Sequence, residues 1–109
     1  MSPAVIPLSP AAARARLRGG PPLVVIDVRP PQERALASIA EPVRTLDADG
    51  LAESLALPRQ TSIAFLCHHG VRSAAAAAYF AGHGFIDVYN VEGGIEAWAL
   101  QADATVPRY

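Results

Sequence analysis

The chain has 109 residues, a formal net charge of −1 and 51% hydrophobic residues. This length predicts a single domain over residues 1–109, able to bury one core without disulfides, and Cys67 is the only cysteine. The near-neutral charge argues against a nucleic-acid partner, because nucleic-acid binding requires a basic surface.

No segment of the sequence predicts a membrane association. The longest apolar stretch, residues 74–81, is far shorter than the roughly 20 residues of a spanning helix. Residues 1–7 lack the basic region and the long apolar region of a signal peptide. We therefore expect a cytoplasmic protein, in which a lone cysteine is either a buried structural residue or a reactive thiol.

The first half of the chain alternates between predicted helices and strands. Ser9 and Pro10 predict the N-cap and first position of a helix that ends near residue 17. The continuous apolar run at 23–28 predicts a strand that is covered on both faces. A short helix is expected within residues 30–37, and residues 38–45 are expected to form a loop with room for one short strand.

The second half repeats this alternation. The expected elements are a helix at 47–57, a buried strand at 63–67, an alanine-rich helix at 72–82, a strand at 86–91 and a helix at 95–100. Such alternation predicts an α/β fold with a mainly parallel central sheet flanked by helices on both faces. Phe65, Leu66, Ile95 and Trp98 are expected in the core.

The main chemical signal lies where the buried strand at 63–67 gives way to the alanine-rich helix. The residues of this loop are Cys67, His68, His69, Gly70, Val71, Arg72 and Ser73. Ligands bind at the carboxyl ends of parallel strands, and loop amides with a helix N-terminus attract anions. A thiol in such a position has a lowered pKa, and we expect Arg72 to add positive potential. We therefore interpret Cys67 as a reactive thiol.

Three segments in a fixed order resemble the signatures of single-domain rhodanese-like sulfurtransferases. They are Asp27-Val28-Arg29 with Glu33, then Cys67-x-x-Gly70-x-Arg72-Ser73, then Gly84-Phe85 with residues 88–98. The resemblance covers nearly the whole chain. It implies that Cys67 accepts a sulfane sulfur, becomes a persulfide and passes the sulfur to a second nucleophile. It also implies that residues 68–73 line the substrate pocket.

The resemblance further implies the kinds of substrate and partner. Thiosulfate or glutathione persulfide would serve as donor, and a thiol such as glutathione, thioredoxin or glutaredoxin would serve as acceptor. No metal or organic cofactor is required. One region departs from the family pattern: Arg34, Ser38-Ile39 and Glu41-Pro42 stand where the family usually has an aromatic, a His-Ile pair and a Gly-Ala pair.

Two other functions remain open at this point. The chain could be a non-catalytic rhodanese-like module in which Cys67 senses reactive sulfur or oxidants and signals to a partner. It could also be a cysteine phosphatase or arsenate reductase. Those enzymes carry Cys-x5-Arg, whereas Cys67 and Arg72 form Cys-x4-Arg, and the tighter loop suits one sulfur atom better than a phosphate.

Several polar residues near the motifs have a structural and a functional interpretation. His68 and His69 are expected to be pocket-wall residues whose amides bind, rather than proton donors. A metal site made of Cys67 and both histidines is disfavoured, because contiguous ligands fold poorly around one ion. Asp27 and Arg29 are expected to tie loops together as a supporting pair.

Overall fold

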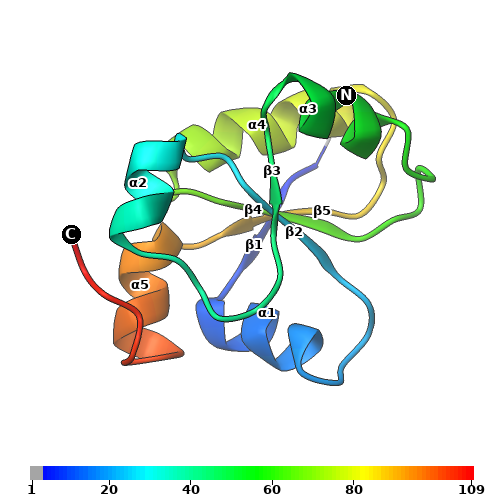
Figure 1. Cartoon of the computed structure of the whole chain (residues 1–109). Helices are drawn as coiled ribbons and strands as arrows, with labels where there is room; N and C mark the ends of the chain where they lie inside the picture. The colour runs from blue at the N-terminus through cyan, green and yellow to red at the C-terminus, as the bar shows by residue number, and fades with distance from the viewer. Residues whose placement is uncertain (1–3) are drawn as a thin grey trace.

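A computed structural model describes residues 4–109 and shows a parallel sheet covered by helices on both faces (Figure 1). Residues 1–3, on which part of the signal-peptide prediction rests, lie outside the described residues. The strands are β1 (Ile6–Leu8), β2 (Val24–Asp27), β3 (Arg44–Thr45), β4 (Ile63–Leu66) and β5 (Val88–Val91). The helices are α1 (Pro10–Leu17), α2 (Pro31–Leu36), α3 (Ala48–Leu55), α4 (Val71–Gly82) and α5 (Gly94–Gln101).

The helix starts follow from local capping. The Ser9 hydroxyl accepts a hydrogen bond from the backbone N–H of Ala12 at 3.1 Å, and Pro10 occupies the first helical position of α1. The Asp47 carboxylate caps α3 in the same way, accepting from the N–H of Gly50 at 2.7 Å. These contacts confirm that both helices begin where the sequence predicts.

The sheet has the order β1-β5-β4-β2-β3, and every neighbouring pair is parallel. The predicted α/β class and the parallel sheet are therefore confirmed. The sequence reading missed β1, a three-residue edge strand that pairs only with β5. Pro7 lies inside β1, and proline is compatible with an edge strand because it donates no ladder hydrogen bond.

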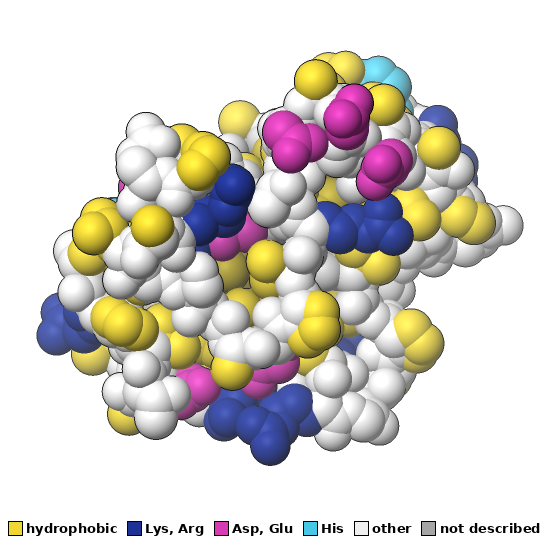
Figure 2. Space-filling view, in the orientation of Figure 1, with side chains coloured by type: hydrophobic (Ala, Val, Ile, Leu, Met, Phe, Trp, Pro, Cys, Tyr) yellow, Lys and Arg dark blue, Asp and Glu magenta, His cyan; other side chains and the backbone are white. Residues whose placement is uncertain are grey.

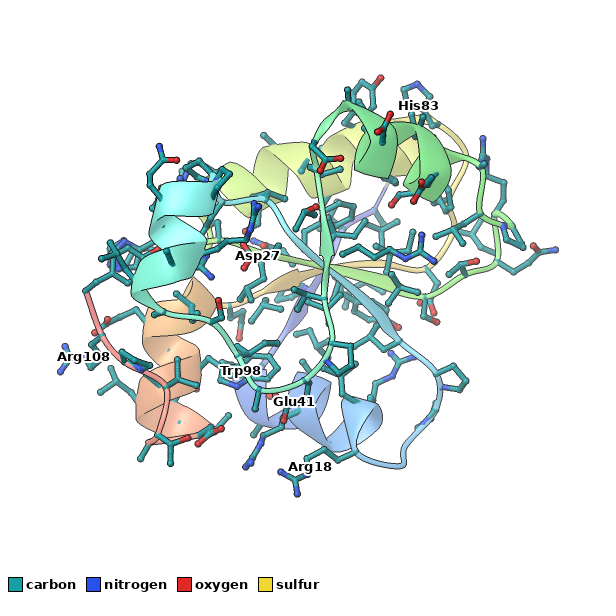
Figure 3. The ribbon with its side chains drawn as sticks, in the orientation of Figure 1. Arg18, Asp27, Glu41, His83, Trp98 and Arg108 are labelled. Carbon is teal, nitrogen blue, oxygen red and sulfur yellow. The ribbon has the colours of Figure 1, made fainter. Side chains whose placement is uncertain are left out.

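Alternate residues of each central strand face two separate cores. Ala64 and Leu66 of β4 pack with Trp98 on the side covered by α1 and α5. Ile63 and Phe65 pack on the side covered by α3 and α4, where Phe65 meets Phe80 at a ring-centroid distance of 4.9 Å. Trp98 projects from α5 towards the sheet (Figure 3), and the four core residues expected from the sequence are all buried.

The register brings the candidate site to one edge of the sheet. Asp27 of β2 lies opposite Leu66 of β4, and Phe65 of β4 lies opposite Asn90 of β5. Cys67 follows Leu66 directly, so the thiol lies at the carboxyl end of the sheet, where loops of parallel folds bind ligands. Among the described residues 4–109, no helix is long and apolar enough to cross a bilayer.

Candidate active site around Cys67

Cys67 lies at the junction between β4 and the loop that precedes α4. Its side chain is buried, with 1% of the residue exposed, and α4 begins at Val71, one residue earlier than the sequence predicts. Gly70 directly precedes this helix and has φ 93°, a left-handed conformation that glycine adopts without a steric penalty. The chain therefore turns sharply over the sulfur and enters α4.

Hydrogen-bond donors of this turn converge on the sulfur. The N–H of Gly70 donates to the Cys67 Sγ at 3.0 Å, and the Ser73 hydroxyl lies 3.2 Å from the same atom. Burial raises the pKa of the Cys67 thiol. The hydroxyl of Ser73 and the backbone N–H groups of Ser73, Gly70 and His69 together lower this pKa by more than burial raises it. The net pKa lies below that of an ordinary thiol, so the site favours the thiolate.

The N-terminus of α5 fixes the orientation of this loop. The N–H of Ile95 donates to the carbonyl oxygen of Cys67 at 2.8 Å, and the N–H of Glu96 donates to that of His68 at 3.1 Å. Because these two carbonyls face α5, the amides that follow can face the sulfur. A Cβ on Gly94 would collide with the same carbonyl oxygens, so glycine is required for this close approach.

A chain of polar side chains leads from the sulfur to β5. The Ser73 hydroxyl donates to Asn90 Oδ1 at 2.6 Å, and Asn90 Nδ2 donates to the carbonyl oxygen of Gly70 at 2.9 Å. Ser73 is fully buried. Asn90 therefore binds both the loop and the hydroxyl that contacts Cys67, so it belongs to the site.

The ring of His68 stacks with the rings of both His69 and Tyr109. The His68 ring lies 3.9 Å from the His69 ring and 3.8 Å from the Tyr109 ring, measured between centroids. Within residues 4–109, neither imidazole forms a hydrogen bond with the Cys67 sulfur, whereas the His69 backbone N–H lowers the pKa of the Cys67 thiol. This arrangement supports the expected role of wall residues.

Arg72 interacts electrostatically with Cys67, as expected, but its guanidinium is also held in an ion pair. Its guanidinium forms a two-pronged ion pair with Glu33, at 2.6 and 2.9 Å. The Tyr109 hydroxyl donates to the same carboxylate at 2.8 Å. These bonds tie the first turn of α4 to α2. Val71, also expected to line the pocket, is 77% exposed and points to solvent.

Asp27 and Arg29 form a fully buried ion pair beside the loop. The Asp27 carboxylate accepts from Arg29 Nη2 at 2.7 Å and from Arg29 Nε at 3.0 Å. Arg29 also donates to the Tyr109 hydroxyl at 3.1 Å and to the carbonyl oxygen of Glu33 at 3.3 Å. This bonding pattern fits the expected supporting role, because one guanidinium joins β2, α2 and the tail.

The segment that departs from the family pattern lies mostly away from the sulfur. Ile39 is buried in the core on the α1 and α5 side. Glu41 pairs with Arg14 of α1 at 3.1 Å. Residues 38–42 therefore support α1 rather than the thiol, whereas Arg34 remains beside the site, where it donates to the carbonyl oxygen of Arg29 at 2.6 Å.

Two residues of the site had no role in the sequence analysis. Asn90 is a polar residue within the otherwise hydrophobic β5 run, which was the one available signal. Tyr109 lies in the segment that follows α5, and nothing in the local sequence indicates that it meets His68. Both are brought to the loop by tertiary packing.

Comparison with known proteins agrees with this geometry. The rhodanese-like domain family matches residues 9–101. The thiosulfate sulfurtransferase GlpE of Pseudomonas putida is 42% identical over 78 residues, covering 69% of this chain and 68% of its own. A rhodanese-like domain protein from Staphylococcus aureus superposes with a TM-score of 0.73 at 26% identity, covering 96% and 99% of the two chains.

A further solved structure is a polysulfide-sulfur transferase from Wolinella succinogenes, determined as a homodimer in solution. It superposes with a TM-score of 0.74 at 26% identity and covers 89% of this chain and 74% of its own. The motifs, the all-parallel sheet and these relatives agree. The chain therefore belongs to the rhodanese-like domain family, as an enzyme of the sulfurtransferase type.

Proposed function

We propose that Cys67 carries sulfane sulfur as a persulfide between a small donor and a thiol acceptor. The observation that carries this proposal is the N–H of Gly70 at 3.0 Å from a buried sulfur. Together with the donors from Ser73 and His69, it lowers the pKa of Cys67 below that of an ordinary thiol and so favours the thiolate. A thiolate is the species that attacks a sulfur–sulfur bond.

In the first step, the Cys67 thiolate attacks the outer sulfur of thiosulfate. A bond forms between Sγ and that sulfur, the sulfur–sulfur bond of thiosulfate breaks, and its electron pair leaves with sulfite. The enzyme then holds Cys67–S–S⁻. The negative charge of the thiolate moves from Sγ to the outer sulfur, where N–H groups of the loop would stabilise it.

In the second step, an acceptor thiolate attacks the outer sulfur of this persulfide. The new bond joins the acceptor sulfur to the outer sulfur, and the bond to Sγ breaks with its electron pair on Cys67. The products are the acceptor persulfide and the original thiolate. The lowered pKa of Cys67 makes it a good leaving group in this step.

The donor and acceptor are proposed on chemical grounds and by similarity. A relative is named a thiosulfate sulfurtransferase, and a structural neighbour is named a polysulfide-sulfur transferase. Thiosulfate and persulfides such as glutathione persulfide are therefore the proposed donors. The proposed acceptors are glutathione or the thiol of a thioredoxin or glutaredoxin.

Sulfite release tests the proposal. Wild-type protein mixed with thiosulfate and a thiol acceptor should release sulfite catalytically, whereas Cys67→Ser should release none above background. Serine keeps the size of the side chain and a hydrogen-bond acceptor, so the loop should remain folded. Turnover by Cys67→Ser at the wild-type rate would contradict the proposal.

A further inference from the structure

A pocket of about 450 Å³ lies beside the active-site loop, between α2 and the start of α3. Figure 2 shows this hollow, with basic and acidic side chains at its border and hydrophobic ones on its floor. Its apolar wall comprises Val28, Pro30, Pro31 and Leu46. Its polar lining comprises Arg29, Arg34, Asp47 and Arg72.

The pocket shares its wall with the thiol loop. Arg72 stands in the first turn of α4, five residues after Cys67. The N–H of Val28 donates at 2.9 Å to the carbonyl oxygen of Leu66, the residue before Cys67. A small ligand in this pocket would therefore lie next to the loop that holds the sulfur.

Arg34 is the uncompensated cation of the pocket. Arg29 is neutralised by Asp27 and Arg72 by Glu33. The ion pairs within residues 4–109 do not include Arg34, and the one hydrogen bond described for its guanidinium goes to the carbonyl oxygen of Arg29. Its remaining guanidinium N–H groups can bind a carboxylate, which accepts such bonds in a matching planar geometry.

Asp47 places a negative charge on the other polar side of the same pocket. Its carboxylate caps α3 through Oδ1 and is exposed. A carboxylate oxygen accepts more than one hydrogen bond, so Asp47 can also bind an ammonium group. The pocket lining therefore offers one positive and one negative partner together with apolar residues.

We propose that this pocket selects zwitterionic thiols and persulfides, in which an α-amino acid group accompanies the reacting sulfur. The ligand carboxylate binds Arg34, its ammonium group faces Asp47, and its sulfur reaches the Cys67 loop. Cysteine and its persulfide carry this group on the carbon next to the one that bears sulfur. The inference rests on the proposed sulfur transfer and names the class of small acceptor or donor that this chain prefers.

Three acceptor thiols distinguish the effect of the ligand carboxylate from that of the ligand ammonium group. Cysteine carries both groups, 3-mercaptopropionate carries the carboxylate alone, and 2-mercaptoethanol carries neither. In Arg34→Gln, the kcat/KM for cysteine and for 3-mercaptopropionate should each fall about tenfold relative to that for 2-mercaptoethanol, as expected for a lost charge-assisted hydrogen bond. Dividing each variant value by the wild-type value removes the intrinsic reactivity of the three thiols.

Asp47→Asn tests the second charge, and asparagine preserves the cap of α3. It should lower kcat/KM for cysteine several-fold relative to 2-mercaptoethanol, and should not lower it for 3-mercaptopropionate. Arg18→Gln is the matched control, because Arg18 points away from the molecule at the end of α1 (Figure 3). Equal changes for all three acceptors in Arg34→Gln, or no change for any, would overturn the inference.

An alkylation assay separates this inference from the proposed function. Iodoacetate carries a carboxylate and iodoacetamide does not, and both label the Cys67 thiolate without sulfur transfer. Arg34→Gln should lower the ratio of the iodoacetate rate to the iodoacetamide rate by about threefold to tenfold, whereas Arg18→Gln should preserve the ratio. An unchanged ratio in Arg34→Gln contradicts the pocket inference. If the ratio falls in Arg34→Gln as expected but the wild-type protein transfers no sulfur, the proposed function is contradicted instead.

Discussion

The Ser73 hydroxyl lies 2.6 Å from Asn90 Oδ1 and 3.2 Å from the Cys67 sulfur, so two acceptors face a single hydroxyl proton. Asn90 cannot reverse its amide without losing the bond from Nδ2 to the carbonyl oxygen of Gly70. Its oxygen therefore stays directed at Ser73. With the neutral thiol, the S–H can donate to Ser73, while Ser73 donates to Asn90; with the thiolate, the proton of Ser73 is shared between two acceptors.

Removing the Ser73 hydroxyl should raise the pKa of Cys67. In Ser73→Ala, one donor to the thiolate is lost, while the burial that raises the pKa remains. The pH midpoint of Cys67 alkylation by iodoacetamide should move upward by about one pH unit, the effect of losing one hydrogen bond to a charged group. A midpoint equal to that of the wild type would mean that the Ser73 proton stays on Asn90.

Asn90→Asp should raise the pKa of Cys67 as well. A carboxylate accepts the Ser73 proton more strongly than an amide does, cannot donate to Gly70, and adds a negative charge near the thiolate. The alkylation midpoint should rise and sulfite release should fall. Gln60→Glu, at an exposed position outside the described hydrogen-bond network, adds the same charge and should leave both readings unaltered. Equal effects of the two substitutions would show that net charge, not position, controls Cys67.

Gly94→Ala should disrupt the thiol loop. The added Cβ would meet the carbonyl oxygens of Cys67 and His68, and Gly94 has φ 63°. We expect sulfite release to fall at least tenfold and the melting temperature to drop, since both steric overlap and a left-handed residue are penalised. Gly82→Ala is the matched control, because a Cβ there meets nothing within 4 Å. Full activity in Gly94→Ala would contradict the described approach of α5 to the loop.

Glu33 should restrain Arg72 at every pH used for assays. The hydrogen bonds from Arg72 and Tyr109 lower the pKa of Glu33 to about 2, despite a small opposing effect of burial. Because the pKa of Glu33 is lower in the folded protein than in the unfolded chain, its ionised form stabilises the fold fully above the unfolded pKa of about 4.3. This stabilisation is lost as the pH falls through about 2. Acidification between pH 8 and 5 therefore leaves the pair ionised, and only substitution separates it.

Glu33→Gln and Arg72→Ala should accordingly have opposite effects on a charged donor. The first frees the guanidinium and should lower the KM for thiosulfate about twofold to fivefold, whereas the second should raise it by a similar factor, as for exposed ion pairs. Initial rates of sulfite release at varied thiosulfate measure both. If both substitutions raise KM equally, Arg72 acts by holding α4 to α2 and does not bind the donor.

Most of the fold was predictable because its signals are local. The Ser9 cap, the buried runs of β2 and β4 and the alanine-rich α4 each follow from a few adjacent residues. β1 was missed because it is defined by its pairing with β5. In this pairing Ile6 lies opposite Tyr89, which is 83 residues later in the chain. Short edge strands carry little sequence signal.

The site was predictable only as far as its loop. Cys67 and the glycine-bearing turn are adjacent in sequence, so a strand end followed by a helix start predicts converging amides. Asn90, Glu33 and Tyr109 reach the loop through contacts between distant segments, such as the bond between Tyr109 and Glu33. The sequence predicted that Arg72 adds positive potential, but it did not predict the ion pair with Glu33, which joins α2 to α4 and depends on the tertiary fold.

The intact mass of the protein after mixing with excess thiosulfate, in the absence of an acceptor, tests the sulfur-carrier claim most directly. The wild-type protein should gain one sulfur atom per chain, release one sulfite per chain, and return to its original mass when a thiol acceptor is added. Cys67→Ser should keep its mass throughout. A wild-type protein that gains no sulfur, or a Cys67→Ser variant that gains it equally, would contradict the account.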